Sequence, residues 1–238
     1  MISVCITTYN GEKYIKDQIM SIISQLSEND EIIVSDDGST DSTLHILQSL
    51  NIGIMKIVKN DGPKGYTPNF ENALRHCSGD YIFLSDQDDV WCPGKISKCM
   101  ELFKKYDFII SDATVVDRDC NILHSSFWEI RKPYKSLPMN LLKFGFLGCC
   151  MAFKRKVLEK ALPIPARYDL CTYDNWIFLI SAARYKVFFL DEQLIFYRRH
   201  GENTSRINKD SSTKTLFRIK YRIYLVYNLI KRIFSRST

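Results

Sequence analysis

Three carboxylates follow one short apolar run in the sequence. Asp86, Asp88 and Asp89 come directly after residues 81–85. Neighbouring carboxylates repel one another unless a proton or a cation resolves their charge. Their oxygens suit Mg²⁺ or Mn²⁺, which keep coordination positions for water and substrate phosphates. The cluster therefore predicts a divalent-metal site that meets a diphosphate, although an acidic turn that caps the next helix would have the same composition.

Two other polar clusters follow apolar runs in the same way. Residues 7–10 follow the run 2–6, and residues 36–41 follow the run 31–35. In an open parallel sheet, ligands bind outside the carboxyl ends of the strands. We therefore expect the three clusters to meet at one edge of a sheet. Taken alone, the turn at residues 36–41 needs no ligand, because turns rich in Asp and Gly are common.

The spacing of apolar residues predicts the elements that position these clusters. Short β-branched runs alternate with stretches that have apolar residues at helical spacing. This alternation indicates an α/β fold with a mostly parallel central sheet and helices on both faces. The second half is less regular, and we expect a loop or lid at residues 119–140. Expected strands are 2–6, 31–35, 54–58, 81–85, 108–111, 145–153 and 187–190, and the principal expected helices are 14–26, 68–77, 155–162 and 173–184.

Composition indicates a globular α/β protein and gives no sign of a nucleic-acid-binding or membrane-spanning one. The 238 residues fit one α/β domain with a short appendage, and the formal charge of +6 is too mild to indicate nucleic-acid binding. The eight cysteines form no CxxC pair, so they predict reduced thiols and a cytoplasmic protein. We find no signal-peptide pattern, and no stretch is apolar enough to predict a stable transmembrane helix.

Four motifs in order give the sequence a family resemblance. The chain resembles family 2 glycosyltransferases with the GT-A fold, over roughly residues 1–205. The last motif is similar to the rhamnosyltransferase-like branch that builds bacterial surface polysaccharides. The motifs are Ile2-Ser-Val-Cys-Ile-Thr-Thr-Tyr-Asn-Gly11, Val34-Ser-Asp-Asp-Gly-Ser-Thr-Asp41, Asn69-Phe-Glu-Asn-Ala-Leu74 and Gly79-Asp-Tyr-Ile-Phe-Leu-Ser-Asp-Gln-Asp-Asp-Val-Trp91.

The resemblance implies a donor site in residues 1–111 and an acceptor-binding part in residues 112–205. It implies that Asp88 contacts the metal and that Asp86 contacts ribose or a metal-bound water. Gln87 matches the variable middle position of the acidic motif. The remaining implied contacts with the nucleotide sugar are Thr7, Tyr9 and Asp37, and more weakly Lys64 and Asn69 in a loop that closes around the donor.

On the acceptor side, Asp174 matches the family's general base. It begins an expected helix, so its residue type would equally suit a helix cap. His200 matches a late histidine that completes the metal shell or touches the diphosphate. Arg198 and Arg199 could pair with phosphate oxygens, although exposed arginines in a polar loop need no ligand. Trp176 lies beside Asp174 and could stack on a sugar, but buried aromatics are more often core.

The implied reaction is inverting, metal-dependent transfer of a sugar from a UDP- or dTDP-linked donor. Candidate sugars are rhamnose, glucose, galactose and N-acetylhexosamines. The implied acceptor is a glycan or lipid-linked oligosaccharide of O-antigen or capsule synthesis. A nucleotidyltransferase shares such a sheet, but it would carry a Gly-rich, basic loop after its first strand. A non-catalytic sugar-nucleotide-binding protein would need no base at Asp174.

Residues 206–238 form a basic tail. Lys214, Arg218, Arg222, Arg232 and Arg236 collect on one side of a helix, with many apolar residues opposite. This pattern predicts an amphipathic helix lying on the anionic inner membrane from the cytoplasmic side. The alternative is a terminal helix packed on the domain with an exposed basic face.

Overall fold

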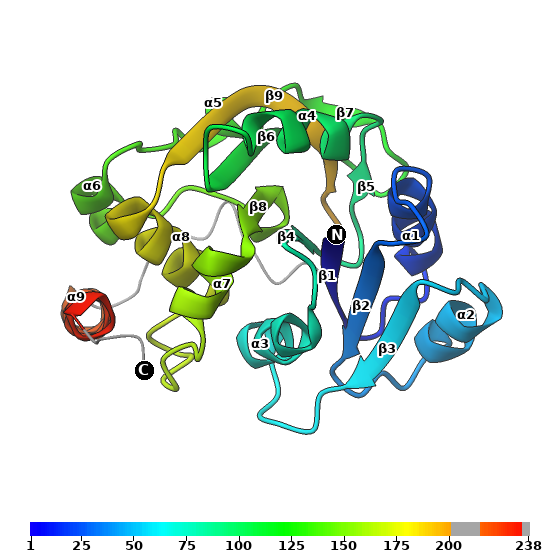
Figure 1. The fold of residues 1–238 in the computed structure, drawn as a ribbon, viewed down its shortest axis with the longest axis horizontal. Coiled ribbons are helices and arrows are strands. Elements are labelled where there is room, and N and C mark those ends of the chain that lie inside the picture. Colours follow the sequence, from blue (N-terminus) through cyan, green and yellow to red (C-terminus); the bar gives the residue numbers. More distant parts are fainter. Residues whose placement is uncertain (201–214, 235–238) are drawn as a thin grey trace.

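The fold is built on one mixed sheet with helices on both faces, and the computed structural model describes residues 1–200 and 215–234. Within these residues the sheet has nine strands in the order β3-β2-β1-β4-β8-β6-β9-β5, with β7 paired to β6 (Figure 1). The strands are β1 (Ile2–Thr8), β2 (Glu31–Asp36), β3 (Met55–Lys59), β4 (Tyr81–Ser85), β5 (Val90–Trp91), β6 (Phe108–Val116), β7 (Ile122–His124), β8 (Met151–Lys154) and β9 (Val187–Arg198).

Helices flank the sheet, as the alternating pattern predicts. Figure 1 shows α3 on one side of β1 and β2, and α1 and α2 on the other. All eight cysteines are free thiols, as expected. The helices are α1 (Ile15–Ile23), α2 (Thr43–Ser49), α3 (Tyr66–His76), α4 (Lys95–Leu102), α5 (Phe127–Ile130), α6 (Leu137–Leu142), the 3₁₀ turn η1 (Gly148–Cys150), α7 (Arg155–Ala161), α8 (Tyr173–Arg184) and α9 (Thr215–Phe234).

The sheet is parallel in its first half and mixed in its second. β3, β2, β1 and β4 are parallel neighbours, and β1 is buried along its whole length, which is why it reads as a continuous apolar run. β8 lies antiparallel between β4 and β6, whereas β6 and β9 are parallel. The α/β expectation is confirmed, and the parallel arrangement holds mainly for the first half.

Several expected boundaries change in the second half. β6 runs through Asp112 instead of ending before it, and β9 continues to Arg198. The segment 119–140, expected as a loop or lid, contains β7, α5 and the start of α6. The expected strand 145–153 is shortened by η1, and only β8 remains as strand. Local sequence spacing misses these pairings because they depend on strands far away in the chain.

α9 packs along α8 and α6 at the outer edge of the molecule (Figure 1). Its Leu225 and Leu229 are buried, whereas Ile223 and Phe234 are 64% and 80% exposed. The helix thus packs on the domain, as the alternative interpretation of the tail expected. It differs from that alternative in its orientation, because its arginine-bearing side faces the domain and much of its apolar side faces outward. The expected boundary at residue 205, with Lys214 and Arg236, lies outside the described residues.

The described helices include none that is both long and apolar enough to cross a bilayer.

Candidate active site

The carboxyl ends of β1, β2 and β4 meet at one edge of the sheet. Thr8 at the end of β1 is paired with Asp36, and Ile6 is paired with Ser85 at the end of β4. The three polar clusters that follow these strands therefore lie side by side, as their positions in the sequence predict. Thr7 is largely buried at this edge, and the side chain of Tyr9 is 55% exposed.

Asp37 is the centre of one cluster. Its Oδ1 accepts a hydrogen bond of 2.6 Å from Asn60 Nδ2, and its Oδ2 accepts one of 2.8 Å from Gly65 N. Lys64 Nζ donates to the Asp37 carbonyl at 2.5 Å and lies 3.7 Å from Oδ1. A carboxylate with lone pairs left over can accept from a nucleobase N–H. Sequence reasoning missed Asn60, which only the register of β3 brings to Asp37.

Gln87 joins the acidic turn to the loop after β1. Its Oε1 accepts hydrogen bonds from Thr8 Oγ1 at 2.7 Å and from Tyr9 N at 2.8 Å, and its Nε2 donates to Tyr9 O at 3.1 Å. A Cβ atom on Gly11 would lie 2.5 Å from Gln87 Oε1. Gln87 therefore fixes the shape of the edge from within, through contacts to protein groups.

Asn69 has a similar bracing position. It is 2% exposed, and its Nδ2 donates to Ser35 O at 3.0 Å while its Oδ1 accepts from Ser35 Oγ at 2.6 Å. These bonds tie α3 to the end of β2. The side chain thus supports this edge of the sheet from below, and its amide is hydrogen-bonded to the protein.

The acidic turn after β4 concentrates negative charge in a buried place. Burial raises the pKa of Asp86 to about 7, with further contributions from the charges of Asp88 and Asp174. Burial and the charges of Asp88 and Asp86 raise the pKa of Asp89, whose side chain is fully buried. Asp89 Oδ2 has no hydrogen-bond partner among the described residues. Such a site favours any cation that compensates its charge.

His200 lies directly against this turn. Its Nε2 is 2.8 Å from Asp88 Oδ2, and both side chains are nearly buried, with 11% and 13% exposed. The end of β9 positions His200 beside the turn. Two residues before His200, Arg198 N donates to Asp89 Oδ1 at 3.0 Å and Arg198 Nε donates to Asp88 O at 2.9 Å. The structure thus brings together the two predicted metal ligands, which lie 112 residues apart in the chain.

Arg198 is a structural residue in this arrangement. It is 4% exposed, its Nη1 donates to Arg118 O at 2.5 Å, and its guanidinium lies 4.6 Å from the centre of the Tyr14 ring. The same ring lies 5.0 Å from the imidazole of His200. Because Nε and Nη1 both donate to protein carbonyls, these bonds do not favour the predicted phosphate contact of Arg198. Tyr14 carried no signal in the sequence, since it reads as an ordinary start of α1.

The residues present fit a hard divalent cation. Asp88 and His200 offer oxygen and nitrogen ligands that are already in contact. Burial and neighbouring carboxylates raise the pKa of Asp86 and Asp89, which a bound cation would counteract. A second compact group, Asp86, Asp89 and the Cys149 thiol, has ligand atoms within 4.8 Å of one another. We favour Asp88 and His200, because a thiol is a poor ligand for Mg²⁺ or Mn²⁺ and Asp89 is fully buried.

Asp174 lies in the first turn of α8. Its Oδ1 accepts hydrogen bonds from Thr172 Oγ1 at 2.5 Å and from Asn175 N at 2.8 Å. Burial raises its pKa, and its charge in turn contributes to the raised pKa of Asp86. Asp174 therefore lies near the acidic turn. It is both a helix-start residue and a carboxylate with raised proton affinity, which suits a general base.

Tyr173 fills the space between these carboxylates. Its ring stacks on Phe70 at 3.8 Å between centres, and a Cβ atom on Gly148 would lie 2.1 Å from its hydroxyl oxygen. Burial and the charges of Asp86 and Asp174 raise its pKa. Gly148 thus provides the room that Tyr173 needs beside the site. The sequence showed a small residue there without indicating which side chain required it.

The two remaining predicted acceptor or phosphate contacts, Trp176 and Arg199, differ in whether their polar atoms already have protein partners. Trp176 is fully buried, and its Nε1 donates to Ala161 O at 2.7 Å, so the structure does not support sugar stacking on its ring. Arg199 is partly buried and donates its backbone N–H to Val116 O at 2.8 Å. Its Nη1 is buried with no hydrogen-bond partner in the described part of the chain, so it keeps a donor for an anion.

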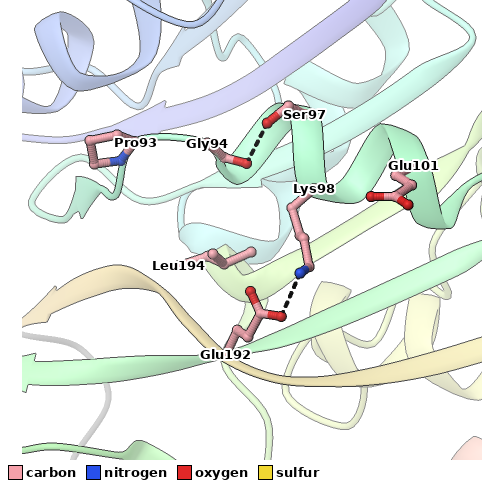
Figure 2. A pocket seen from close by; sticks show the side chains of 7 residues that line it. All are labelled: Pro93, Gly94, Ser97, Lys98, Glu101, Glu192 and Leu194. Carbon is pink, nitrogen blue, oxygen red and sulfur yellow. Dashed lines mark hydrogen bonds and ion pairs between the residues drawn. The ribbon is translucent and has the colours of Figure 1, made fainter.

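A hollow of about 250 Å³ lies elsewhere, between the start of α4 and β9. Figure 2 shows Lys98 and Glu192 pointing toward one another, and Lys98 Nζ lies 2.7 Å from Glu192 Oε1. None of the predicted site residues lines this hollow. It therefore lies apart from the predicted donor site.

Comparisons with known proteins identify the family and the fold. The model of "Glycosyl transferase family 2" matches residues 3–162. A dTDP-rhamnosyl transferase, RfbG of Shigella flexneri, is 27% identical over 93% of this chain and 78% of its own length. S. aureus TarS in complex with UDP-GlcNAc superposes with a TM-score of 0.69 at 17% identity, over 100% of this chain and 67% of that one. A mannosyltransferase of Pyrobaculum calidifontis, in complex with GDP-Man and Mn²⁺, gives a TM-score of 0.63 at 16% identity, over 100% and 65%.

The structural likenesses establish the fold, which is that of the GT-A neighbours. The chain spans about two thirds of the length of several curated relatives and of these solved structures.

Proposed function

This chain belongs to glycosyl transferase family 2, and from that premise we propose that it is an inverting, metal-dependent enzyme that transfers a sugar from a UDP- or dTDP-linked donor to a glycan or lipid-linked acceptor. The observation that carries the proposal is the contact of Asp88 with His200 beside a second carboxylate, the partly buried Asp86. We further propose that it acts in bacterial surface polysaccharide synthesis, at the cytoplasmic face of the inner membrane. The rhamnosyl transferase relative supports rhamnose among the candidate sugars.

The donor would lie along the carboxyl edge of β1, β2 and β4. Asp37 would accept a hydrogen bond from the base, with Asn60 and Gly65 fixing the direction of its carboxylate. Thr7 and Tyr9 lie at the same edge, and Lys64 closes over Asp37. Because a carboxylate only accepts, this arrangement favours bases that carry an N–H at the contacted position, as uracil and thymine do.

Asp88 and His200 would hold Mn²⁺ or Mg²⁺, and Asp86 would lie beside them. Such an ion, when bound, stabilises negative charge on a diphosphate leaving group. Arg199 would add a charged donor to the same oxygens. The Mn²⁺ in the mannosyltransferase structure supports manganese as a candidate for this chain.

Asp174 would accept the proton of the acceptor hydroxyl while its oxygen attacks the anomeric carbon. Thr172 and Asn175 hold one carboxylate oxygen, which leaves the other for the acceptor. A single displacement of this kind inverts the anomeric carbon. The raised pKa of Asp174 brings its proton affinity closer to what a base needs near neutral pH.

A donor screen with the purified full chain tests this proposal. Released UDP or dTDP is measured with and without EDTA, and the variants Asp174→Asn and, as a matched control, Asp191→Asn are compared. We expect Asp174→Asn to lose at least about a thousandfold in kcat with little change in donor Kd, because a base acts only in the transition state. Asp191 is exposed, and its variant should be unaffected. Nucleotide release that resists EDTA, or an active Asp174→Asn variant, would refute the mechanism.

A further inference from the structure

An apolar strip runs along the outward side of α9. Its side chains recur every three or four residues over five turns, and Leu216 is 77% exposed, Tyr227 62% and Ile230 52%. Soluble surfaces seldom leave such a continuous apolar strip uncovered. We call this strip the α9 ridge; its members are Leu216, Ile219, Ile223, Val226, Tyr227, Ile230 and Phe234.

The arginines of α9 hold the helix so that the ridge faces outward. Arg232 donates to the carbonyls of Lys160, Leu162 and Pro163 at 2.6–2.9 Å, at and just after the carboxyl end of α7. Arg222 donates to Leu142 O at 2.8 Å, at the carboxyl end of α6. Cations at these two helix ends satisfy free carbonyls and the helix dipole. The orientation is therefore built by specific contacts, and the exposed ridge is their consequence.

The charges beside the ridge distinguish between possible partners. Lys220 and Lys231 are exposed at its border, and α9 contains no acidic residue. Helix pairing between two copies usually relies on opposite charges at the border of the seam, which two α9 helices cannot supply. An anionic bilayer accepts both features, because the ridge enters the acyl boundary while lysines reach the headgroups.

A hollow of about 490 Å³ widens the same surface. It lies between α9 and the loop before α8, and apolar side chains make up most of its lining, with Arg167 and Lys220 at the margin. Leu216, Ile219 and Ile223 belong both to this hollow and to the ridge. The apolar surface is thus broader than one helix.

We propose that the α9 ridge is a membrane-docking surface for anionic lipid. This inference deepens the proposed function, because α9 also contacts the catalytic helix. Tyr221 of α9 accepts a hydrogen bond of 2.7 Å from Asn175 Nδ2, and Asn175 directly follows Asp174. Docking the ridge would place the lipid surface roughly one helix diameter, about 10 Å, from α8. An acceptor carried on a lipid would then meet Asp174 close to the headgroups.

Vesicle flotation of the full chain tests the proposal. We expect the protein to float with phosphatidylcholine vesicles that contain about one third phosphatidylglycerol, and much less with phosphatidylcholine alone. The ridge variant Ile223→Ser/Ile230→Ser should lose about tenfold or more in partitioning. A matched control is Ile122→Ser/Leu123→Ser on β7, whose side chains are 66% and 51% exposed outside the ridge. This control should float as the parent does.

A second pair of variants tests the role of charge. Lys220→Gln/Lys231→Gln should weaken binding to anionic vesicles by about fivefold for each lysine and leave binding to neutral vesicles unchanged. Circular dichroism confirms that each variant is folded. Equal flotation of ridge variant and parent would overturn the proposal. So would a parent that does not float but sediments as a dimer that the ridge variant converts to monomer, since the ridge would then be a subunit interface.

Failure of the proposed function gives a different result from failure of the docking surface. If the chain floats through the ridge but releases no nucleotide from any donor, the docking surface stands and the reaction does not. If the ridge variant keeps full nucleotide release with a soluble acceptor but loses lipid binding, both proposals are supported.

Discussion

The buried charge of the acidic turn should make the metal-free protein less stable as the pH rises. Burial, Asp88 and Asp174 raise the pKa of Asp86 from 3.8 to about 7. Between these values the native carboxyl holds a proton that the unfolded one has lost, so the unfolding free energy falls with rising pH. Each pH unit is worth about 1.4 kcal/mol, and from pH 5 to the pKa near 7 this gives about 2–3 kcal/mol from Asp86. Asp89 and Asp174 contribute with the same sign.

Urea denaturation at about pH 5, 6, 7 and 8 measures this loss. With EDTA present, the unfolding free energy should fall over this range. Saturating Mn²⁺ should remove much of the fall, since bound metal stabilises the ionised site. Asp86→Asn should flatten the pH dependence without metal, whereas Asp191→Asn at an exposed carboxyl should leave it unchanged.

The opposite slope would refute the reasoning. If the metal-free protein keeps or gains stability from pH 5 to pH 8, Asp86 is ionised without cost, and the turn does not concentrate charge. A fall that persists unchanged in Asp86→Asn would assign the effect to other groups. In either case the electrostatic argument for a metal at this turn would lose its basis.

Three further expectations follow from single contacts. Gly148→Ala should cost about 1–3 kcal/mol in urea denaturation, because the new methyl overlaps the hydroxyl of Tyr173; an unchanged midpoint would show that the ring can move away. Tyr14→Ala should weaken Mn²⁺ binding about tenfold in calorimetry, with Tyr14→Phe close to the parent, because the ring supports His200; equal affinities would remove Tyr14 from the site. Arg232→Gln should cost about 2 kcal/mol of unfolding free energy through lost charged hydrogen bonds, and a neutral effect would contradict its role in seating α9.

The position of the polar clusters at one edge of the sheet can be predicted from the sequence, because it depends on the residue pattern within each strand and the loop that follows it. A buried parallel strand is a continuous apolar run, and a polar cluster after it lies at the carboxyl edge. Asp37 and Asp86 therefore reach one edge in any fold with this strand order. The register of β1 with β2 and β4 confirms it.

The roles of individual side chains were harder to predict, because they depend on contacts between distant segments. Arg198 and Trp176 have suitable residue types for ligand binding. However, Arg198 Nε and Trp176 Nε1 both donate hydrogen bonds to carbonyls of the protein. Periodicity shows that α9 has two unlike sides without showing which one faces the domain. That choice is made by carbonyls at the ends of α6 and α7, whose free lone pairs attract Arg222 and Arg232.

The bond between Gln87 and the Tyr9 backbone has a consequence for divergence among homologues. A methyl group at residue 11 would overlap the side-chain amide of Gln87, which is held in place by its bond to Tyr9 O. A homologue with a short side chain at position 87 would remove this overlap, and the atom nearest to a Cβ at residue 11 would then be Thr8 Oγ1, at 3.0 Å. Substitutions at these two sites should consequently be correlated: a residue larger than glycine at position 11 is expected only where the side chain at position 87 is short.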